Sequence, residues 1–257
     1  MMLGLLTQLG SVTLTRLAAL GRAAFFVGQV LGLVVAPPLK WRLIVQQIHF
    51  VGARSVVVIA LTGAFAGMVL GLQGFHVLTR FGSEALLGQF VSLTLIAELG
   101  PVFSALMVTA RAGSAITAQI GIMRITEQLD AMTVMALNPL RYVAVPNVVA
   151  GTLVMPLLGA MFSVIGIYGG YVAGVVILGV NRGTYFGGIE DVVDLQDVTN
   201  GVYKSLCFGL VVMLVCCFKG YHAGYGAEGV SKATTEAVVI SAVLILVLDY
   251  FLNTVLL

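Results

Sequence analysis

Long stretches without a charged residue are the feature of this chain that most limits its fold. Residues 55–79 hold 25 uncharged positions, residues 142–181 hold 40, and the 26 residues of 85–110 include a single charge, Glu98. A helix needs roughly 20 apolar residues to cross a bilayer. The whole chain is 60% hydrophobic and 9% charged, against about 45–50% and about 25% in soluble domains. The sequence therefore predicts an all-α, polytopic membrane protein.

Two further spans are predicted by length, although each has to include a charge. Only 14 uncharged residues, 205–218, separate Lys204 from Lys219, so a full crossing has to begin near Val198 and take Lys204 into the membrane. A crossing over residues 237–257 likewise includes Asp249. Together with the three stretches above, this predicts about five transmembrane helices.

The first 53 residues are predicted to form an N-terminal interfacial segment, and residues 54–257 the transmembrane domain. The apolar run 23–36 has 14 residues before Pro37 and Pro38, which is short for a span and typical of an element lying on the membrane. With the N-terminus in the cytoplasm, ten of the 13 Lys and Arg residues lie inside or at the inner boundary. The positive-inside rule favours that orientation, which puts the C-terminus on the outer side.

Glu98, Lys204 and Asp249 are the strongest candidates for a functional site. A charge at membrane depth costs at least about 2.5–3.5 kcal/mol on insertion scales, and a helical rise of about 1.5 Å per residue places all three in one layer. Pro101 cannot donate a hydrogen bond to the carbonyl of Ala97, which predicts a distorted helix beside the carboxylate.

The three charges have two interpretations. Lys204 forms a structural ion pair with Glu98 or Asp249, or the three side chains line a cavity that receives a polar headgroup. With two acids and one base, one acid needs a proton, water or a further partner, because an unpaired buried carboxylate neutralises itself.

Glycines recur at intervals of four in the first and third spans. Such faces let helices approach closely in lipid. They are predicted to pack helices within one subunit or to form a subunit interface. Five helices enclose little space, so a homodimer is the natural way to build a central cavity. The helix-packing candidates are Gly63, Gly67, Gly71, Gly166, Gly170 and Gly174.

A short amphipathic helix is predicted at about residues 122–137, between the second and third spans. Its apolar positions Ile125, Leu129, Met132 and Ala136 recur at helical spacing. By default such a helix lies at the membrane interface with a solvated polar face. The alternative is a coupling helix that receives force from a cytoplasmic motor. The coupling candidates are Arg124, Glu127, Gln128, Asp130 and Met132.

Enzyme signatures are poor in this sequence. No G-x-x-x-x-G-K-[ST] string occurs, so the chain is not expected to hydrolyse ATP in the P-loop manner by itself. His49, His76 and His222 are far apart and lack the spacing of metal ligands. No metal, no cofactor bound by this chain and no nucleic-acid partner are expected. One alternative class is a secondary transporter that carries protons on Glu98 and Asp249, and another is a structural scaffold.

Several separated strings resemble one family of transport proteins. They are G-M-V-L-G-L-Q-G from Gly67, A-E-L-G-P from Ala97, A-R-A-G-S-A from Ala110, E-Q-L-D-A-M from Glu127, N-P-L-R-Y from Asn138 and L-D-Y-F from Leu248. In this order, and over nearly the whole chain, they resemble the MlaE permease family of ABC lipid transporters. One departure is Ala97, where some members place an arginine before the glutamate.

The resemblance implies a homodimeric permease in the bacterial inner membrane that moves phospholipids between inner and outer membranes and maintains outer-membrane lipid asymmetry. It implies three partners: a cytoplasmic ABC ATPase that binds ATP and Mg, a STAS-domain protein and a periplasmic hexamer of MCE-domain proteins. Glu98, Lys204 and Asp249 would be the family's intramembrane polar residues, and the helix at 124–136 its ATPase-coupling helix. The segment before Arg54 would be its interfacial helix.

Overall fold

The computed structural model describes residues 2–36 and 40–256, with side chains from residue 17 onward in those ranges. The regular elements there are all helical, which confirms the all-α prediction. The α-helices in chain order are α1 (Met2–Val35), α2 (Trp41–Ile48), α3 (Val56–Thr79), α4 (Leu87–Leu93), α5 (Gly100–Val108), α6 (Ser114–Ile125), α7 (Gln128–Val134), α8 (Val145–Tyr171), α9 (Arg182–Val192), α10 (Leu195–Tyr221) and α11 (Gly226–Leu256).

Short π-helical segments join several of these helices into longer rods. In the described ranges, six stretches are long and apolar enough to cross a membrane by length and composition. The last five correspond to the five predicted spans, and the additional one is part of α1. The six stretches are Leu17–Val35, Trp41–Thr79, Glu84–Ile125, Leu140–Ile177, Leu195–Tyr221 and Gly226–Leu256.

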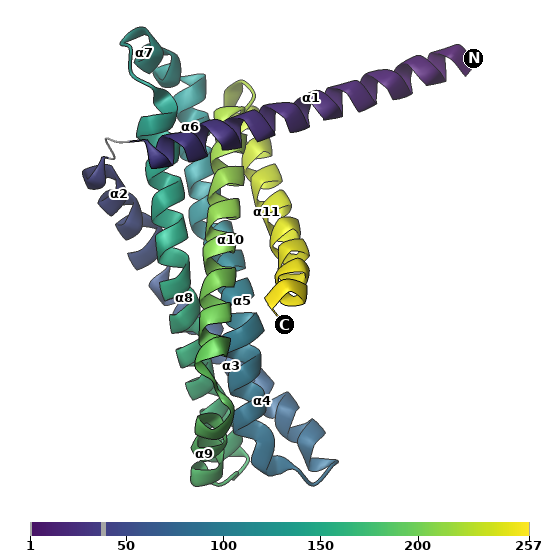
Figure 1. The fold of residues 1–257 in the computed structure, drawn as a ribbon, viewed down its shortest axis with the longest axis vertical. Coiled ribbons are helices and arrows are strands. Elements are labelled where there is room, and N and C mark those ends of the chain that lie inside the picture. The colour runs from purple at the N-terminus through teal and green to yellow at the C-terminus, as the bar shows by residue number, and fades with distance from the viewer. Residues whose placement is uncertain (1, 37–39, 257) are drawn as a thin grey trace.

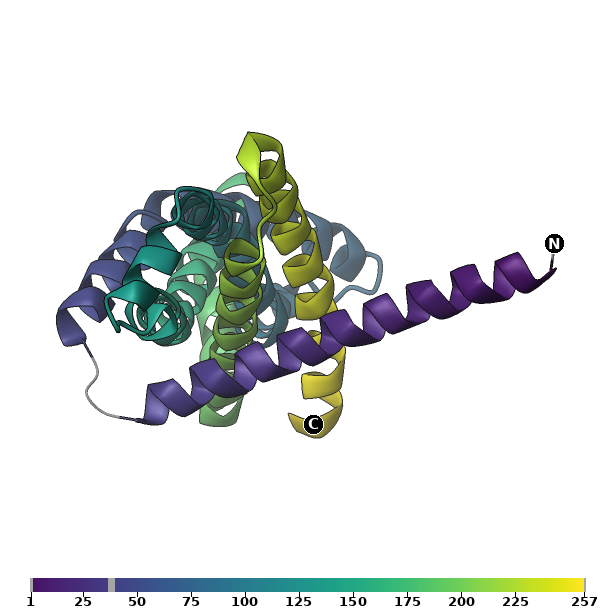
Figure 2. The same ribbon diagram turned by 90° about the horizontal axis from the view of Figure 1, so that it is seen from above.

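Helix α1 crosses the bundle, whereas the other rods run along it (Figure 1). Seen from above, α1 runs along one side of the bundle, and its first turns extend beyond it (Figure 2). One contact joins its end to the π-helical segment η5 (Leu140–Ala144), where Arg141 Nη2 donates to the carbonyl of Ala36 at 2.8 Å. Lys40, just before α2, places its Nζ atom 3.6 Å from the Tyr142 ring centroid of the same segment. This direction suits the predicted interfacial placement of α1, which stays a prediction.

The predicted interfacial segment 1–53 contains more than α1. Helix α2 and the π-helical segment η1 (His49–Ala53) pack against α8, so residues 41–53 are part of the bundle. The predicted boundary at residue 53 coincides with a two-residue junction, residues 54–55, before α3 begins. The sequence argument missed this because it counted only uncharged residues, and Arg42 and Arg54 interrupt that count.

Glycines allow α3 and α8 to touch along their backbones. A Cβ atom on Gly67 would collide with the carbonyl oxygen of Gly166, and one on Gly71 would lie 2.9 Å from the carbonyl oxygen of Gly170. Real Cβ contacts are not that short, so only glycine permits this separation of the two helices. These four glycines therefore pack two helices of the same subunit.

The remaining two predicted glycines have different neighbours. A Cβ atom on Gly63 would lie 3.0 Å from the carbonyl oxygen of Phe162, again between α3 and α8. Gly174 instead faces the side chain of Leu87, at the start of α4. The same rod also faces the other two glycines of the third span, since a Cβ on Gly166 would lie 2.9 Å from Leu95 and one on Gly170 would lie 2.7 Å from Val91. The stripe of three glycines therefore packs along the stretch Glu84–Ile125 as well as touching α3.

Helix α10 begins at a capping box formed by two acids. Asp194 Oδ1 accepts a hydrogen bond from the Leu195 N–H at 3.1 Å, and Asp197 Oδ2 accepts one from the Asp194 N–H at 3.2 Å. From this start α10 continues unbroken for 27 residues. Lys204 is nine residues past Leu195, so at ~1.5 Å per residue it lies roughly 14 Å along the helix.

The helix predicted at about 122–137 is two separate pieces. Arg124 belongs to the last turn of α6, and Glu127 has a left-handed backbone with φ of 59°, so α7 starts only at residue 128. Ala136, with φ of 57°, lies beyond the end of α7. The break redirects the chain so that Leu129 is buried, and the Arg124 Nη1–Asp130 Oδ1 ion pair, 3.0 Å long, holds the two pieces together.

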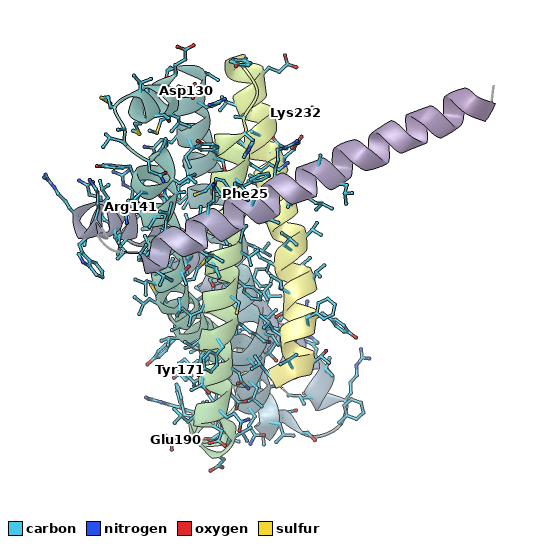
Figure 3. The ribbon with its side chains drawn as sticks, turned by 45° about the horizontal axis from the view of Figure 1, so that its top comes forward. Phe25, Asp130, Arg141, Tyr171, Glu190 and Lys232 are labelled. Atoms are coloured by element: carbon cyan, nitrogen blue, oxygen red, sulfur yellow. The ribbon has the colours of Figure 1, made fainter. Side chains whose placement is uncertain are left out.

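Helices α7 and α9 lie at opposite ends of the bundle (Figure 1). Asp130 and Lys232 lie at one end of the molecule, and Glu190 lies at the other (Figure 3). The basic cytoplasmic side and the acidic outer side predicted from the sequence thus correspond to two different ends of the bundle.

Candidate functional site

Lys204 lies at the centre of a buried polar cluster. Its side chain is 2% exposed, and its Nζ atom is 3.0 Å from Glu98 Oε2 and 3.5 Å from Asp249 Oδ1. The three predicted site residues therefore come together from three different membrane-spanning stretches. This geometry agrees with both interpretations of the three charges. Lys204 forms ion pairs with the two acids, and the three side chains together form a polar layer.

The carbonyl oxygen of Ala97 completes the coordination of the lysine, accepting a hydrogen bond from Nζ at 2.8 Å. In a regular α-helix this carbonyl would accept from the N–H four residues later, but that residue is Pro101, which has none. Residues 94–99 form the π-helical segment η3, and Pro101 lies in the first turn of α5. The helix is distorted where the sequence predicted. Lys204 donates to the Ala97 carbonyl, which lacks its regular helical donor because Pro101 has no N–H.

Glu98 has a further partner that the sequence argument missed. Asn253 Nδ2 donates a hydrogen bond to Glu98 Oε2 at 3.0 Å. Asn253 lies four residues after Asp249, so both project from the same face of α11. That spacing is the signal that could have identified it. Asp249 Oδ1, in contrast, has no hydrogen-bond partner among the described residues, so the two acids are held unequally.

The cluster is closed around the lysine and open at the carboxylates. The side chains of Glu98 and Asp249 are 39% and 20% exposed, against 2% for Lys204. The ammonium is therefore neutralised inside the protein, as a buried charge has to be. The outer edge presents carboxylate oxygens, which accept hydrogen bonds from water or from a polar ligand.

An apolar crevice of about 150 Å³ lies between α8 and α10. Its wall includes Ile96, Pro101, Gly201 and Ser205, so Pro101 borders the crevice as well as the distorted turn beside the cluster. A crevice of this size and character has room for a segment of an acyl chain. Apolar and polar binding surfaces thus lie close together, which is the combination that an amphiphile needs.

The coupling candidates gather at the α7 end of the bundle but occupy two helices and the turn between them. The side chains of Arg124 and Asp130 are 35% and 60% exposed, and Glu127 and Gln128 are exposed. Met132 is half-buried. The polar side chains are accessible to a partner at this end.

Residues 44–255 match the family described as "Permease MlaE". The chain belongs to this family. The match to MlaE proteins starts within α2 and ends near the last turn of α11, so it covers the bundle and leaves out α1.

Curated relatives in the MlaE family match the chain over most of its length. The "Intermembrane phospholipid transport system permease protein MlaE" of Haemophilus influenzae is 41% identical, covering 99% of this chain and 98% of its own. A "Probable ABC transporter permease protein" of Rickettsia bellii is 38% identical over 98% of each chain. The "Protein TRIGALACTOSYLDIACYLGLYCEROL 1, chloroplastic" of Arabidopsis thaliana is 30% identical, covering 88% of this chain and 65% of its own.

Proposed function

We propose that this chain is the membrane permease subunit of an ABC transporter that moves phospholipids between the inner and outer membranes of a bacterium. In this role it maintains the lipid asymmetry of the outer membrane. The observation that carries the proposal is the end-to-end similarity to the Haemophilus relative, whose name states phospholipid transport. The buried cluster around Lys204 and the neighbouring apolar crevice support it, because they offer polar and apolar contacts at one depth.

The energy for transport comes, in this proposal, from a separate cytoplasmic ATPase that binds ATP and Mg. The chain contains no P-loop string, and the exposed polar residues around α7 offer a docking surface at the bundle end where α1 lies. Two such chains form a homodimer around a shared cavity. A STAS-domain protein and a periplasmic hexamer of MCE-domain proteins complete the assembly.

The proposed location is the inner membrane, with the N-terminus and α7 in the cytoplasm and the C-terminus on the periplasmic side. The excess of Lys and Arg near the α7 end supports this orientation, since positive residues are retained on the cytoplasmic side. The acids that cap α10 then lie on the periplasmic side, where membrane potential and anionic lipids do not oppose them.

Reconstitution separates this function from its alternatives. The chain is placed in liposomes with its co-purifying partners, and transfer of a fluorescent phospholipid to acceptor particles is measured. We expect transfer that requires ATP and persists when the proton gradient is collapsed. Transfer that requires a proton gradient and ignores ATP would instead establish a secondary transporter using Glu98 and Asp249. Normal transfer by the combined variant Glu98→Ala, Lys204→Ala, Asp249→Ala would show that the cluster has no transport role.

A further inference from the structure

A second polar cavity lies at the end of the bundle that α1 crosses. It has a volume of about 460 Å³ and is an open pocket lined by α1, the last turns of α10 and the first turns of α11. Figure 3 shows Lys232, one of its lining residues, at this end of the bundle near α1. The cavity is far along α10 from Lys204, so it is separate from the cluster described above.

Positive charge exceeds negative charge in this cavity. Three cations line it, Arg22, Lys219 and Lys232, against one carboxylate, Glu236. Lys219 Nζ pairs with Glu236 Oε2 at 2.7 Å. Arg22 and Lys232 form no ion pair with any carboxylate whose side chain the structure places. Two exposed cations from two different helices therefore face a cavity in which Glu236, the single acid among its described lining residues, is already paired with Lys219. The charge of Lys232 also acts on Glu236, but no ion-pair contact joins them.

The inner wall of the cavity is apolar and aromatic. Phe218 lines it and contacts the His222 ring in a tilted arrangement, with 4.5 Å between the ring centroids. Phe26 of α1 packs edge-on against Phe218 at 5.5 Å. The methyl groups of Ala19 in α1 and Ala233 in α11 complete the wall. The cavity thus combines a cationic rim with an apolar floor.

These features indicate a ligand with an anionic head and an apolar body. Arg and Lys are the side chains that bind phosphate, Arg through paired N–H groups and Lys as a point charge. Basic pockets between membrane helices on the cytoplasmic side are typical sites for anionic lipid headgroups. Inorganic phosphate shares the anionic chemistry, but it would not use the aromatic floor.

We propose that this cavity, between α1, α10 and α11, binds the phosphate group of an anionic phospholipid from the leaflet next to α1. Arg22 and Lys232 contact the phosphate, and the Phe218 wall contacts the glycerol and the first carbons of the acyl chains. A role in lipid uptake or release rests on the proposed transport function. Binding itself does not, and can be measured alone.

Photo-crosslinking tests the site on the full chain. The protein is placed in phosphatidylcholine nanodiscs with a small fraction of phosphatidylglycerol carrying a photoreactive group near its headgroup, and labelled peptides are mapped by mass spectrometry. The test variant is Arg22→Gln, Lys232→Gln. The matched control is the double variant Arg80→Gln, Arg182→Gln. It also removes two exposed positive charges, but at the end of the bundle where α9 lies. Gel filtration and thermal melting confirm that both variants fold.

We expect wild-type labelling in peptides that cover residues 219–236, reduced about fivefold for each charge removed in the test variant. The control should label like the wild type. Undiminished labelling of the test variant, or an equal loss in the control, would overturn the site. Displacement of the lipid by inorganic phosphate would overturn the assignment to a lipid. If labelling behaves as expected while ATP-driven transfer is absent, the proposed function fails and this site stands.

Discussion

The Nζ atom of Lys204 and the carbonyl oxygen of Ala97 are joined by a hydrogen bond of 2.8 Å. This bond links the charge carried by α10 to the helix that Pro101 distorts. Because Glu98 follows Ala97 directly, the lysine contacts a backbone carbonyl and a carboxylate on the same turn. A movement of that turn would displace both contacts together, so the helix irregularity and the ion cluster act as one unit.

Replacing Lys204 by Ala should lower the free energy of unfolding by about 1.5–3 kcal/mol, because two carboxylates lose their cation but stay partly exposed to water. The combined variant Lys204→Ala, Asp249→Ala should be less destabilised than Lys204→Ala alone, since it strands one acid fewer. Denaturation in detergent measures both, with the exposed Arg80→Ala as the control. Strictly additive effects in this double-mutant cycle would reject the pairing of Lys204 with Asp249.

The two acids of the cluster should respond differently to neutralisation. Glu98 forms an ion pair with Lys204 at 3.0 Å and accepts a hydrogen bond from Asn253, whereas Asp249 lies at the longer distance of 3.5 Å from Lys204. Allowing for the partial exposure of Glu98, we expect Glu98→Gln to cost about 1–2 kcal/mol and Asp249→Asn clearly less. Thermal melting of the two purified variants checks this order. A larger effect of Asp249→Asn would contradict the geometry.

Substitution of Gly67 by Ala should separate α3 from α8. The added methyl group meets the backbone of Gly166, and a backbone cannot move aside as a flexible side chain can. We expect a loss of about 1–3 kcal/mol in the free energy of unfolding. Gly187→Ala is the matched control, because a Cβ there meets nothing within 4 Å. Equal melting temperatures for both variants would show that the helices tolerate the added methyl group.

Replacing Asp130 by Lys should weaken co-purification with the ATPase while leaving membrane insertion intact. The change breaks the 3.0 Å ion pair with Arg124 and places a like charge beside it. The swapped variant Arg124→Asp, Asp130→Arg should recover much of the binding, because it restores the pair between α6 and α7. Asp191→Lys, at the opposite end of the bundle, serves as the control. Undiminished recovery of the ATPase with Asp130→Lys would exclude this surface from coupling.

Much of the fold could be predicted because each membrane-spanning helix can be recognised from its own apolar sequence. A run of about 20 apolar residues predicts a span whatever its neighbours are. The five spans of the bundle were therefore predictable from composition and charge spacing. The common depth of Glu98, Lys204 and Asp249 followed from helical rise alone, and the distortion near Pro101 followed from its missing N–H.

The tertiary structure decided everything that depends on how each helix is rotated against its neighbours. The rotation of the helices brings Lys204 to the carbonyl of Ala97 and Glu98 to the side-chain amide of Asn253. It leaves Asp249 Oδ1 without a hydrogen-bond partner among the described residues. It also set Gly67 against Gly166 and turned Gly174 toward Leu87. The break at Glu127 also belongs to the tertiary level, since Leu129 in the first turn of α7 is buried. A local sequence pattern cannot predict these contacts, because each depends on packing between segments that are far apart in the chain.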